Sequence, residues 1–344
     1  MLRQVSSLNQ PEEQLQPLKR RIAIAIPARN EARVIDACLG HVARMQEDQR
    51  VLGLSVSVLA NNCDDETGTR AREFANMWSG NCEVLTVTLP PARAHAGWAR
   101  RLALDAAARN LANPEDVLLC TDADSLVAKD WVSRNLDYLD QGYDAVAGRA
   151  RFNPRERRHM ARAFRARLAA IKGYEAALAY LRAARDPAEP WPRHFDEGGA
   201  SIAVTLDAYC RIGGAPTPPL GEDRALFDAI RRAGGRVRHP TDVRVLTSPR
   251  LVGRARGGAS DTLARWSVQA SDVPIDGLMR VDAALGEPHG DASPLSFAAL
   301  SSEVKYARTL VASARRAAQS CEPAPEVEAV GVVTLRAFNR ERSA

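Results

Sequence analysis

Short apolar runs alternate with amphipathic stretches over the first third of the chain, and this alternation constrains the fold most strongly. The runs over residues 22–26 and 54–59 are each followed by a polar turn and then by apolar residues at helical spacing, as at Ile35, Cys38 and Val42. EVLTVTLP and GWARRLALDAAARNLA form a third such unit, and DVLLC is a fourth run. Strands that alternate with helices predict an α/β fold with a mostly parallel central sheet flanked by helices.

Polar residues follow several of these runs, and parallel strands bring such residues to one edge. Ligands of parallel sheets bind outside the carboxyl ends of the strands. The turns after Ile26 and Leu59 and the pair Asp122 and Asp124 in TDADS would meet there. Carboxylates two residues apart on an extended segment share a side and repel each other, unless a divalent cation lies between them and a ligand. Such a cation would neutralise a diphosphate and help it leave; a solvated acidic turn is the alternative.

A second acidic pair, Glu222 and Asp223 in GEDRALF, opens a predicted helix that Gly234 would end. Acidic residues at a helix N-terminus are explained by capping and by the helix dipole alone. The same position favours an ionised carboxylate, which a general base requires. Both interpretations are open from the residues.

Composition limits the class of protein and its partners. The chain has 344 residues, of which 45% are apolar and 26% charged, as in an ordinary globular protein. The sequence has no apolar run long enough to span a membrane and no signal peptide at its start, and six scattered cysteines suit reduced thiols, so we expect a cytoplasmic protein. A net charge of +5 reflects either solubility or an anionic ligand or membrane surface, and we expect no nucleic-acid partner.

The second half of the chain is less regular. An Arg-rich helix is predicted over Arg155–Arg185, and it could be a solvated face, a platform for an anionic acceptor or a contact with acidic lipid. RVRHPTDVRVLTSPR predicts one or two strands, and residues from about 251 onward are predicted to be helical, including a helix over Phe297–Ala318. Trp191 and His194 precede the segment GGAS and could contact a sugar or simply pack.

Five motifs occur in one order: IPARNE, LANNCDDET, GWARRLAL, TDADS and GEDRAL. This series, over about Ile22 to Arg250, resembles the family 2 nucleotide-sugar glycosyltransferases of the GT-A fold. The resemblance implies a nucleoside-diphosphate sugar as donor, a bridging Mn²⁺ or Mg²⁺ ion, a hydroxyl acceptor and transfer with inversion. It also implies a catalytic domain over 21–250 divided at 125 into a nucleotide-sugar half and an acceptor half. The polar N-terminus itself predicts a mobile tail over residues 1–20, and the Ala/Arg-rich residues over 251–344 predict a helical C-terminal extension.

The resemblance also implies roles for residues on the donor side. Asp124 would be the direct metal ligand, Asp122 would face the ribose or the metal, and Arg100 would meet base or phosphate. Arg250 is our own candidate for binding the diphosphate, with surface solvation as the alternative. The first loop would contact the nucleoside through Pro27, Ala28, Arg29 and Glu31.

On the acceptor side, the resemblance implies that Asp223, with its neighbour Glu222, supplies the base. The acceptor side under the sugar would be lined by Gly199, Ala200 and Ser201.

The sequence also departs from the family pattern. Where members carry an Asp that contacts the base, this chain has Ala60, followed by Asn61, whose amide can still bind a base edge. The Gln-x-x-Arg-Trp signature and the membrane spans of processive synthases are missing, which favours a soluble enzyme that adds one sugar. His239 could add to the metal, although a histidine at a strand edge is more often structural.

Other functions remain open at this stage. A degenerate sugar-nucleotide-binding protein is compatible with Ala60. A haloacid-dehalogenase-like phosphatase also uses Asp-x-Asp after a strand, but Lys129 and Lys172 are poorly placed for it. A nucleotidyltransferase would need a Gly-rich, Lys-ending first loop, and a P-loop enzyme would need GxxxxGK; neither pattern is present.

Overall fold

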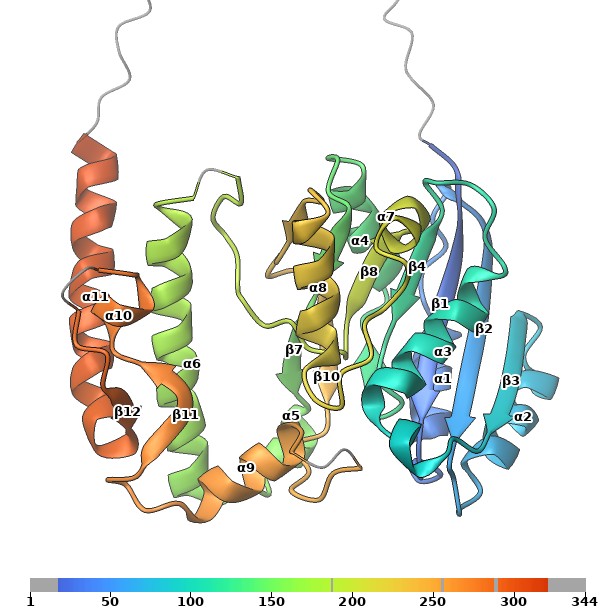
Figure 1. The fold of residues 1–344 in the computed structure, drawn as a ribbon, viewed down its shortest axis with the longest axis horizontal. Helices are drawn as coiled ribbons and strands as arrows, with labels where there is room; N and C mark the ends of the chain where they lie inside the picture. Colours follow the sequence, from blue (N-terminus) through green and yellow to red (C-terminus); the bar gives the residue numbers. More distant parts are fainter. Residues whose placement is uncertain (1–17, 187, 255–256, 288–289, 321–344) are drawn as a thin grey trace, which may run out of the picture.

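A seven-stranded sheet forms the centre of the protein (Figure 1). This computed structural model describes residues 18–186, 188–254, 257–287 and 290–320. The strands of the central sheet are β1 (Arg20–Ala28), β2 (Val51–Asn61), β3 (Asn81–Val87), β4 (Val117–Cys120), β6 (Ala145–Ala147), β8 (Ile202–Thr205) and β9 (Val237–Arg238). Their order is β3-β2-β1-β4-β8-β6-β9, and β8 runs antiparallel to both neighbours, whereas the other adjacent pairs are parallel.

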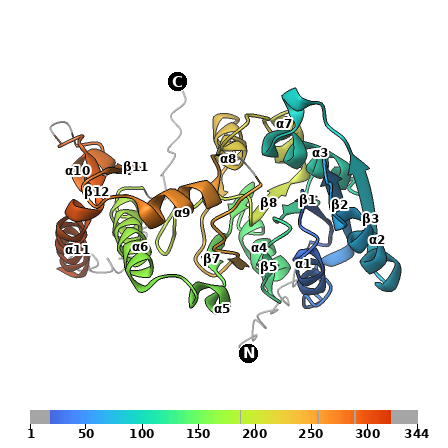
Figure 2. The same cartoon turned by 90° about the horizontal axis from the view of Figure 1, so that it is seen from below.

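Helices cover both faces of this sheet, as the two views show (Figures 1 and 2). The helices on one face are α1 (Ile35–Val42), α2 (Thr67–Met77) and α4 (Trp131–Leu139), and those on the other are α3 (Ala96–Ala108), α7 (Leu206–Arg211) and α8 (Glu222–Arg232). Successive residues of β1 point to opposite faces, so Ile24 packs in the first core and Ala25 in the second. Full burial of a side chain such as Ile24 stabilises the fold by about 1.5–3 kcal/mol.

A smaller sheet connects the central sheet to the rest of the molecule. Its strands are β5 (Leu126–Val127), β10 (Arg244–Thr247) and β7 (Arg149–Phe152), in the order β5-β10-β7. β10 is antiparallel to β5 and parallel to β7. Because β5 begins two residues after Asp124 and β10 ends three residues before Arg250, this sheet brings the segments of Asp124 and Arg250 together.

Two long helices, α6 (Arg162–Ala183) and α11 (Phe297–Ser320), lie side by side at the other end of the molecule (Figures 1 and 2). Tyr174 and Leu178 of α6 pack with Leu300 and Val304 of α11 in a separate core. The short elements here are β11 (Pro274–Met279), β12 (Pro294–Ser296), α9 (Ala259–Val268) and α10 (Val281–Ala284). The two remaining elements are α5 (Pro154–Arg157) and the 3₁₀ turn η1 (Pro91–Arg93).

Most predicted elements are confirmed, including the three strand–helix units, the fourth strand and the helix over Phe297–Ala318; of the one or two strands predicted in RVRHPTDVRVLTSPR, two are present, β9 and β10. The single helix predicted over Arg155–Arg185 is wrong, because the chain breaks between α5 and α6 where Met160 packs against the core of Phe164 and Leu168. The helical extension predicted after residue 251 is present as α9, α10 and α11, but it is not continuous. The antiparallel pair β11–β12 interrupts it, where Pro274 and Gly277 disfavour a helix.

The predicted domain boundary at 250 stays a prediction, although α6 from the acceptor half and α11 from the extension share one core. The predicted tail lies mainly outside the described residues. Among the residues that are described, no helix has the length and apolar character needed to cross a membrane.

Candidate active site

The loops that follow β1 and β2 meet at the carboxyl edge of the sheet and are tied to each other. Asn30 has a positive φ of 56°, which turns the chain sharply after β1. The next backbone N–H, that of Glu31, donates to the Thr67 hydroxyl at 2.7 Å, and the N–H of Ala32 donates to Asp65 at 3.1 Å. This edge therefore has a fixed shape before any ligand binds.

The two asparagines after β2 have different surroundings. Asn62, with φ of 46°, uses its side-chain amide on both the carbonyl and the N–H of Leu89, at 2.9 and 3.1 Å. It therefore fixes the end of β2 to the segment after β3. Asn61 is buried, as is Ala60 before it. Asn61 remains our candidate for a base contact.

Arg100 of α3 lies between the two acidic motifs of the site and contacts both of them. Its buried guanidinium donates to Asp122 at 3.0 Å, to Glu222 at 3.2 Å and to the carbonyl of Gly199 at 3.2 Å. Burial opposes the charge on this group, but the carboxylates of Asp122 and Glu222 outweigh it and raise the pKa of Arg100 above its usual range. Arg100 thus joins the Asp-x-Asp motif to the Glu-Asp motif, although 122 residues separate it from Glu222.

Gly199 lies against Arg100 and links it to Asp223. A Cβ atom at this position would collide with the Arg100 guanidinium, so only glycine leaves room for the contact. The N–H of Gly199 donates to one Asp223 carboxylate oxygen at 3.0 Å, and the N–H of Arg224 donates to the other at 2.8 Å. Asp223 is half-buried, whereas Glu222 is buried and bound to Arg100.

A second arginine binds the other carboxylates of the edge. Arg250, after β10, makes a bidentate pair with Glu31 at 2.6 and 2.5 Å and contacts Asp124 at 3.1 Å. Arg250 is half-buried, which does not fit the alternative of a solvated surface group, and its role in binding a diphosphate stays a prediction. Burial and then repulsion from Asp122 raise the pKa of Asp124 to about 6, although Arg250 opposes the shift.

This crowding of carboxylates suits a divalent cation. Asp122 and Asp124 are oxygen donors at one sheet edge, and repulsion between them is what an added positive charge would relieve. Within the described part of the chain, no group of three or more His, Cys, Asp or Glu side chains is arranged to hold a metal ion. Mg²⁺ and Mn²⁺ are typically held by one or two carboxylates, with substrate phosphates and water as further ligands. The two aspartates fit that donor set.

The other predicted site residues contact segments that surround this edge of the sheet. Ala200 and Ser201 are buried: the Ala200 carbonyl accepts from Thr121 at 2.7 Å, and the Ser201 hydroxyl accepts from the Trp131 indole at 2.8 Å. Arg29 donates to the Ala94 carbonyl at 3.3 Å. Pro27 and Ala28 form the end of β1.

His239 has a structural setting. Its Nδ1 contacts Glu189 at 2.9 Å and its Nε2 contacts Glu197 at 2.9 Å, so both ring nitrogens are engaged. Burial opposes a charge on the ring, but these two carboxylates raise the pKa of His239. The structure therefore does not bring His239 to the aspartate pair.

Sequence reasoning missed several residues that hold the site. Thr67 and Asp65 connect the first two loops, and Thr121 and Trp131 hold the segment of Gly199. The threonine and aspartate stand in DDET at a predicted helix start, which is a capping pattern that could have indicated a loop contact. The roles of Thr121 and Trp131 depend on contacts across more than 60 residues and had no local signal.

Comparison with known proteins identifies the family. The model described as glycosyl transferase family 2 matches residues 23–202, which is more than half of the chain. The chain therefore belongs to glycosyl transferase family 2; it is a glycosyltransferase with the GT-A fold. This assignment replaces the phosphatase alternative. A search of curated proteins gave no match.

Solved structures of similar fold were also found. The mannosyltransferase PcManGT from Pyrobaculum calidifontis, in complex with GDP-Man and Mn²⁺, is 21% identical, with 92% of this chain and 81% of that chain covered and a TM-score of 0.49. S. aureus TarS 1-349 in complex with UDP-GlcNAc is 15% identical, with 78% of this chain and 71% of that chain covered and a TM-score of 0.49. Glucosyl-3-phosphoglycerate synthase from Mycobacterium tuberculosis, in complex with Mn²⁺, UDP-Glc and PGA, is 17% identical, with 80% of this chain and 88% of that chain covered and a TM-score of 0.44.

Proposed function

We propose that this glycosyltransferase is metal-dependent, and that it moves a sugar from a nucleoside-diphosphate sugar to a hydroxyl acceptor with inversion, using Asp223 as the general base. One observation supports this most: a continuous set of hydrogen bonds runs from Asp122 through Arg100 and Gly199 to Asp223. The carboxylates assigned to donor binding and to acceptor activation are thereby held in one arrangement by the buried Arg100 and by Gly199.

The donor side would work through Asp122, Asp124 and Arg250. A bound Mn²⁺ or Mg²⁺ ion, held by the two aspartates, would neutralise the diphosphate and help it leave. Arg250 would exchange its contact with Asp124 for the diphosphate oxygens, because a guanidinium binds phosphate in the same bidentate way as it binds carboxylate. Asn61 would contact the base, and the loop of Pro27, Ala28, Arg29 and Glu31 would enclose the nucleoside.

The acceptor side would work through Asp223. Its two oxygens each accept one backbone N–H bond, which fixes the carboxylate and leaves lone pairs for the acceptor hydroxyl proton. As the hydroxyl oxygen attacks the anomeric carbon opposite the leaving diphosphate, its proton passes to Asp223. Glu222 would act as a positioning residue, because its carboxylate binds Arg100 in the buried interior.

The experiment that tests this function is a donor screen followed by one substitution. The protein is tested with UDP- and GDP-sugars and Mn²⁺, first by thermal shift and then for release of the nucleoside diphosphate. Asp223→Asn should reduce turnover by about 10²–10⁴-fold, the usual contribution of a general base, while nucleotide binding persists.

Asp228→Asn is the matched control, since Asp228 is an exposed aspartate on the same helix, α8, whose carboxylate contacts Arg231 and whose carbonyl accepts from Arg232. Turnover in this control should equal that of the wild type. If Asp223→Asn turned over as fast as Asp228→Asn, the base assignment would be wrong. Binding without turnover in the wild type would favour a degenerate binding protein.

A further inference from the structure

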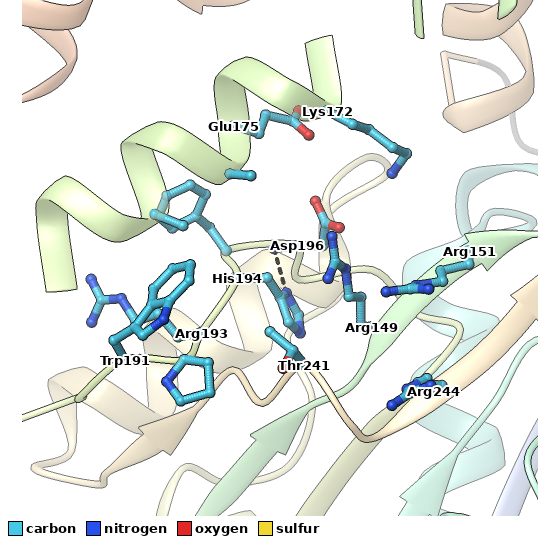
Figure 3. Close-up of a pocket in the computed structure, with 14 residues that line it drawn as sticks. Arg149, Arg151, Lys172, Glu175, Trp191, Arg193, His194, Asp196, Thr241 and Arg244 are labelled. Atoms are coloured by element: carbon cyan, nitrogen blue, oxygen red, sulfur yellow. Dashed lines mark hydrogen bonds between the residues drawn. The ribbon is translucent and has the colours of Figure 1, made fainter. Parts of the chain in front are cut away.

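A cavity of about 340 Å³ lies between helix α6 and the small sheet, on the acceptor half (Figure 3). This volume lies within the usual range for a small-molecule site, about 300–1,000 Å³. Arg149, Arg151 and Arg244 line it from β7 and β10, and Lys172 lines it from α6. We refer to these four cations as the basic cluster.

The basic cluster carries charge without matching anions. Arg149 and Arg244 are direct partners in the β7–β10 register, and Arg151 stands two residues further along β7. Among the described residues, no carboxylate lies within ion-pair distance of any of the four cations. Three guanidiniums are thereby held together on adjacent strands, which costs energy unless an anion joins them.

The remaining walls reduce this positive charge only in part. Glu175 and Asp196 are the two carboxylates of the lining, and burial and then Asp196 raise the pKa of Glu175 to about 7. His194 is buried, and burial lowers its pKa to about 4, so that ring is neutral at physiological pH. Arg193 also lines the cavity, but its guanidinium binds Asp186 and Glu189 at 3.0 and 3.1 Å.

Burial and the repulsion within the basic cluster together perturb Arg151. Burial and then the neighbouring charges of Arg149 and Arg244 lower the pKa of Arg151. Elsewhere on the surface, arginines such as Arg211 and Arg134 lie beside carboxylates. The cavity therefore has the character of an anion site, with Trp191 and Phe195 as its apolar walls.

The cavity is connected to the candidate base by a short piece of chain. Asp196 in its lining is three residues before Gly199, whose N–H binds Asp223 at 3.0 Å. Three extended residues span at most about 11 Å, so the cavity wall lies close to the point where the acceptor hydroxyl would react. By the same limit, Arg244 is at most about 22 Å along the chain from Arg250 beside Asp124.

We propose that the basic cluster binds a phosphate group carried by the acceptor, so that this enzyme glycosylates a phosphorylated alcohol. This proposal rests on the proposed function, because the cavity matters to catalysis only if Asp223 activates a hydroxyl nearby. Several guanidiniums suit a phosphate because each can donate two parallel hydrogen bonds to its oxygens. The phosphate belongs either to a soluble polyol phosphate or to a phospholipid headgroup, and the test separates the two.

The test is a titration of the full-length protein with glycerol 3-phosphate and, as the uncharged match, with glycerol. It is made without divalent metal, so that the phosphate is not held by a metal ion at Asp122 and Asp124. Wild type should bind glycerol 3-phosphate and not glycerol. The double variant Arg151→Gln with Arg244→Gln should bind it at least about tenfold more weakly, because charge-assisted hydrogen bonds are lost.

The control is the double variant Arg155→Gln with Arg157→Gln, which removes the same charge from exposed arginines of α5 outside the cavity. It should bind like wild type. The thermal midpoint of the cavity variant should be equal to or above that of wild type, because Arg151 and Arg244 repel each other. Equal binding by the cavity and control variants would overturn the proposal.

A second titration uses vesicles of phosphatidylcholine with and without phosphatidic acid. Binding to the acidic vesicles alone, lost in the cavity variant and kept in the control, would support a phospholipid acceptor. Binding of glycerol 3-phosphate would support a soluble one. If neither probe binds in a way that depends on Arg151 and Arg244, the basic cluster is no phosphate site.

Failure of this proposal can be told apart from failure of the proposed function. Binding of UDP and GDP with Mn²⁺ is measured on the wild type in parallel. If nucleotides bind but phosphate binding does not depend on the cavity, the acceptor proposal alone is wrong. If no nucleotide binds while the cavity still binds phosphate, the proposed function is wrong and the phosphate site remains.

Discussion

The two arginine-rich regions of this protein differ in how their charges are matched. At the carboxyl edge of the central sheet, Arg100 and Arg250 each contact two carboxylates. In the cavity beside α6, the basic cluster has no ion pair within the described residues. Cations that are paired with carboxylates, such as Arg100 and Arg250, hold the site in shape and can exchange a carboxylate for a phosphate. Cations without such partners, as in the basic cluster, are free to bind an anionic ligand.

The largest effect on stability is expected at Arg100. Arg100→Met would leave Glu222 buried without its partner and would free Asp122, and loss of one partner of a buried pair typically costs about 3–5 kcal/mol. Denaturant unfolding measures this cost. The control is Arg134→Met, since Arg134 is an exposed arginine with surface partners, where the loss should stay below about 1 kcal/mol.

Comparable losses of stability in the two variants would mean that Arg100 stabilises the protein no more than an exposed arginine does. A larger loss at Arg100 would support the interpretation that its matched, buried ion pairs hold the site in shape. The cavity arginines provide a third reference point, because their removal is expected to cost nothing.

A smaller effect is expected at Arg250, which contacts Asp124 and would compete there with the proposed metal ion. Arg250→Gln should tighten binding of Mn²⁺ alone by about tenfold, since a positive charge close to the metal position is removed. The same variant should weaken binding of UDP or GDP in the presence of Mn²⁺, because a diphosphate ligand is lost. Titration calorimetry measures both.

Arg254→Gln is the matched control for that experiment. Its guanidinium donates to the Asn30 carbonyl at 2.9 and 2.8 Å, so it belongs to the same region with a different kind of partner. Mn²⁺ affinity should be unchanged in this control. An unchanged or weaker Mn²⁺ affinity in Arg250→Gln would show that the guanidinium does not oppose the metal.

The local sequence pattern was enough to predict the parts of the fold that depend on residues close together in the sequence. Periodicity predicted β1, β2 and β3 with the helices that follow them, and β4, and the topology of parallel strands then predicted that Asp122 would lie at the ligand edge. The same reasoning suggested Asp223 at the start of a helix. These features follow from spacing alone.

Long-range contacts could not be predicted in this way. The pair of Arg250 and Glu31 joins residues 219 positions apart, and nothing near either residue specifies the other. The antiparallel placement of β8 and the β11–β12 pair also depend on packing partners far away in sequence. The basic cluster had a weak signal, the alternating arginines of RARF at Arg149 and Arg151, which place both on one face of a strand.

The proposed function depends most directly on whether Asp124 holds a metal ion against a nucleoside diphosphate. Calorimetry of UDP and GDP binding, with and without Mn²⁺, on wild type and on Asp124→Ala measures this. We expect Mn²⁺ to strengthen nucleotide binding in wild type and to have no such effect in the variant. Nucleotide binding that gains equally from Mn²⁺ in both proteins, or that never depends on the metal, would contradict the account.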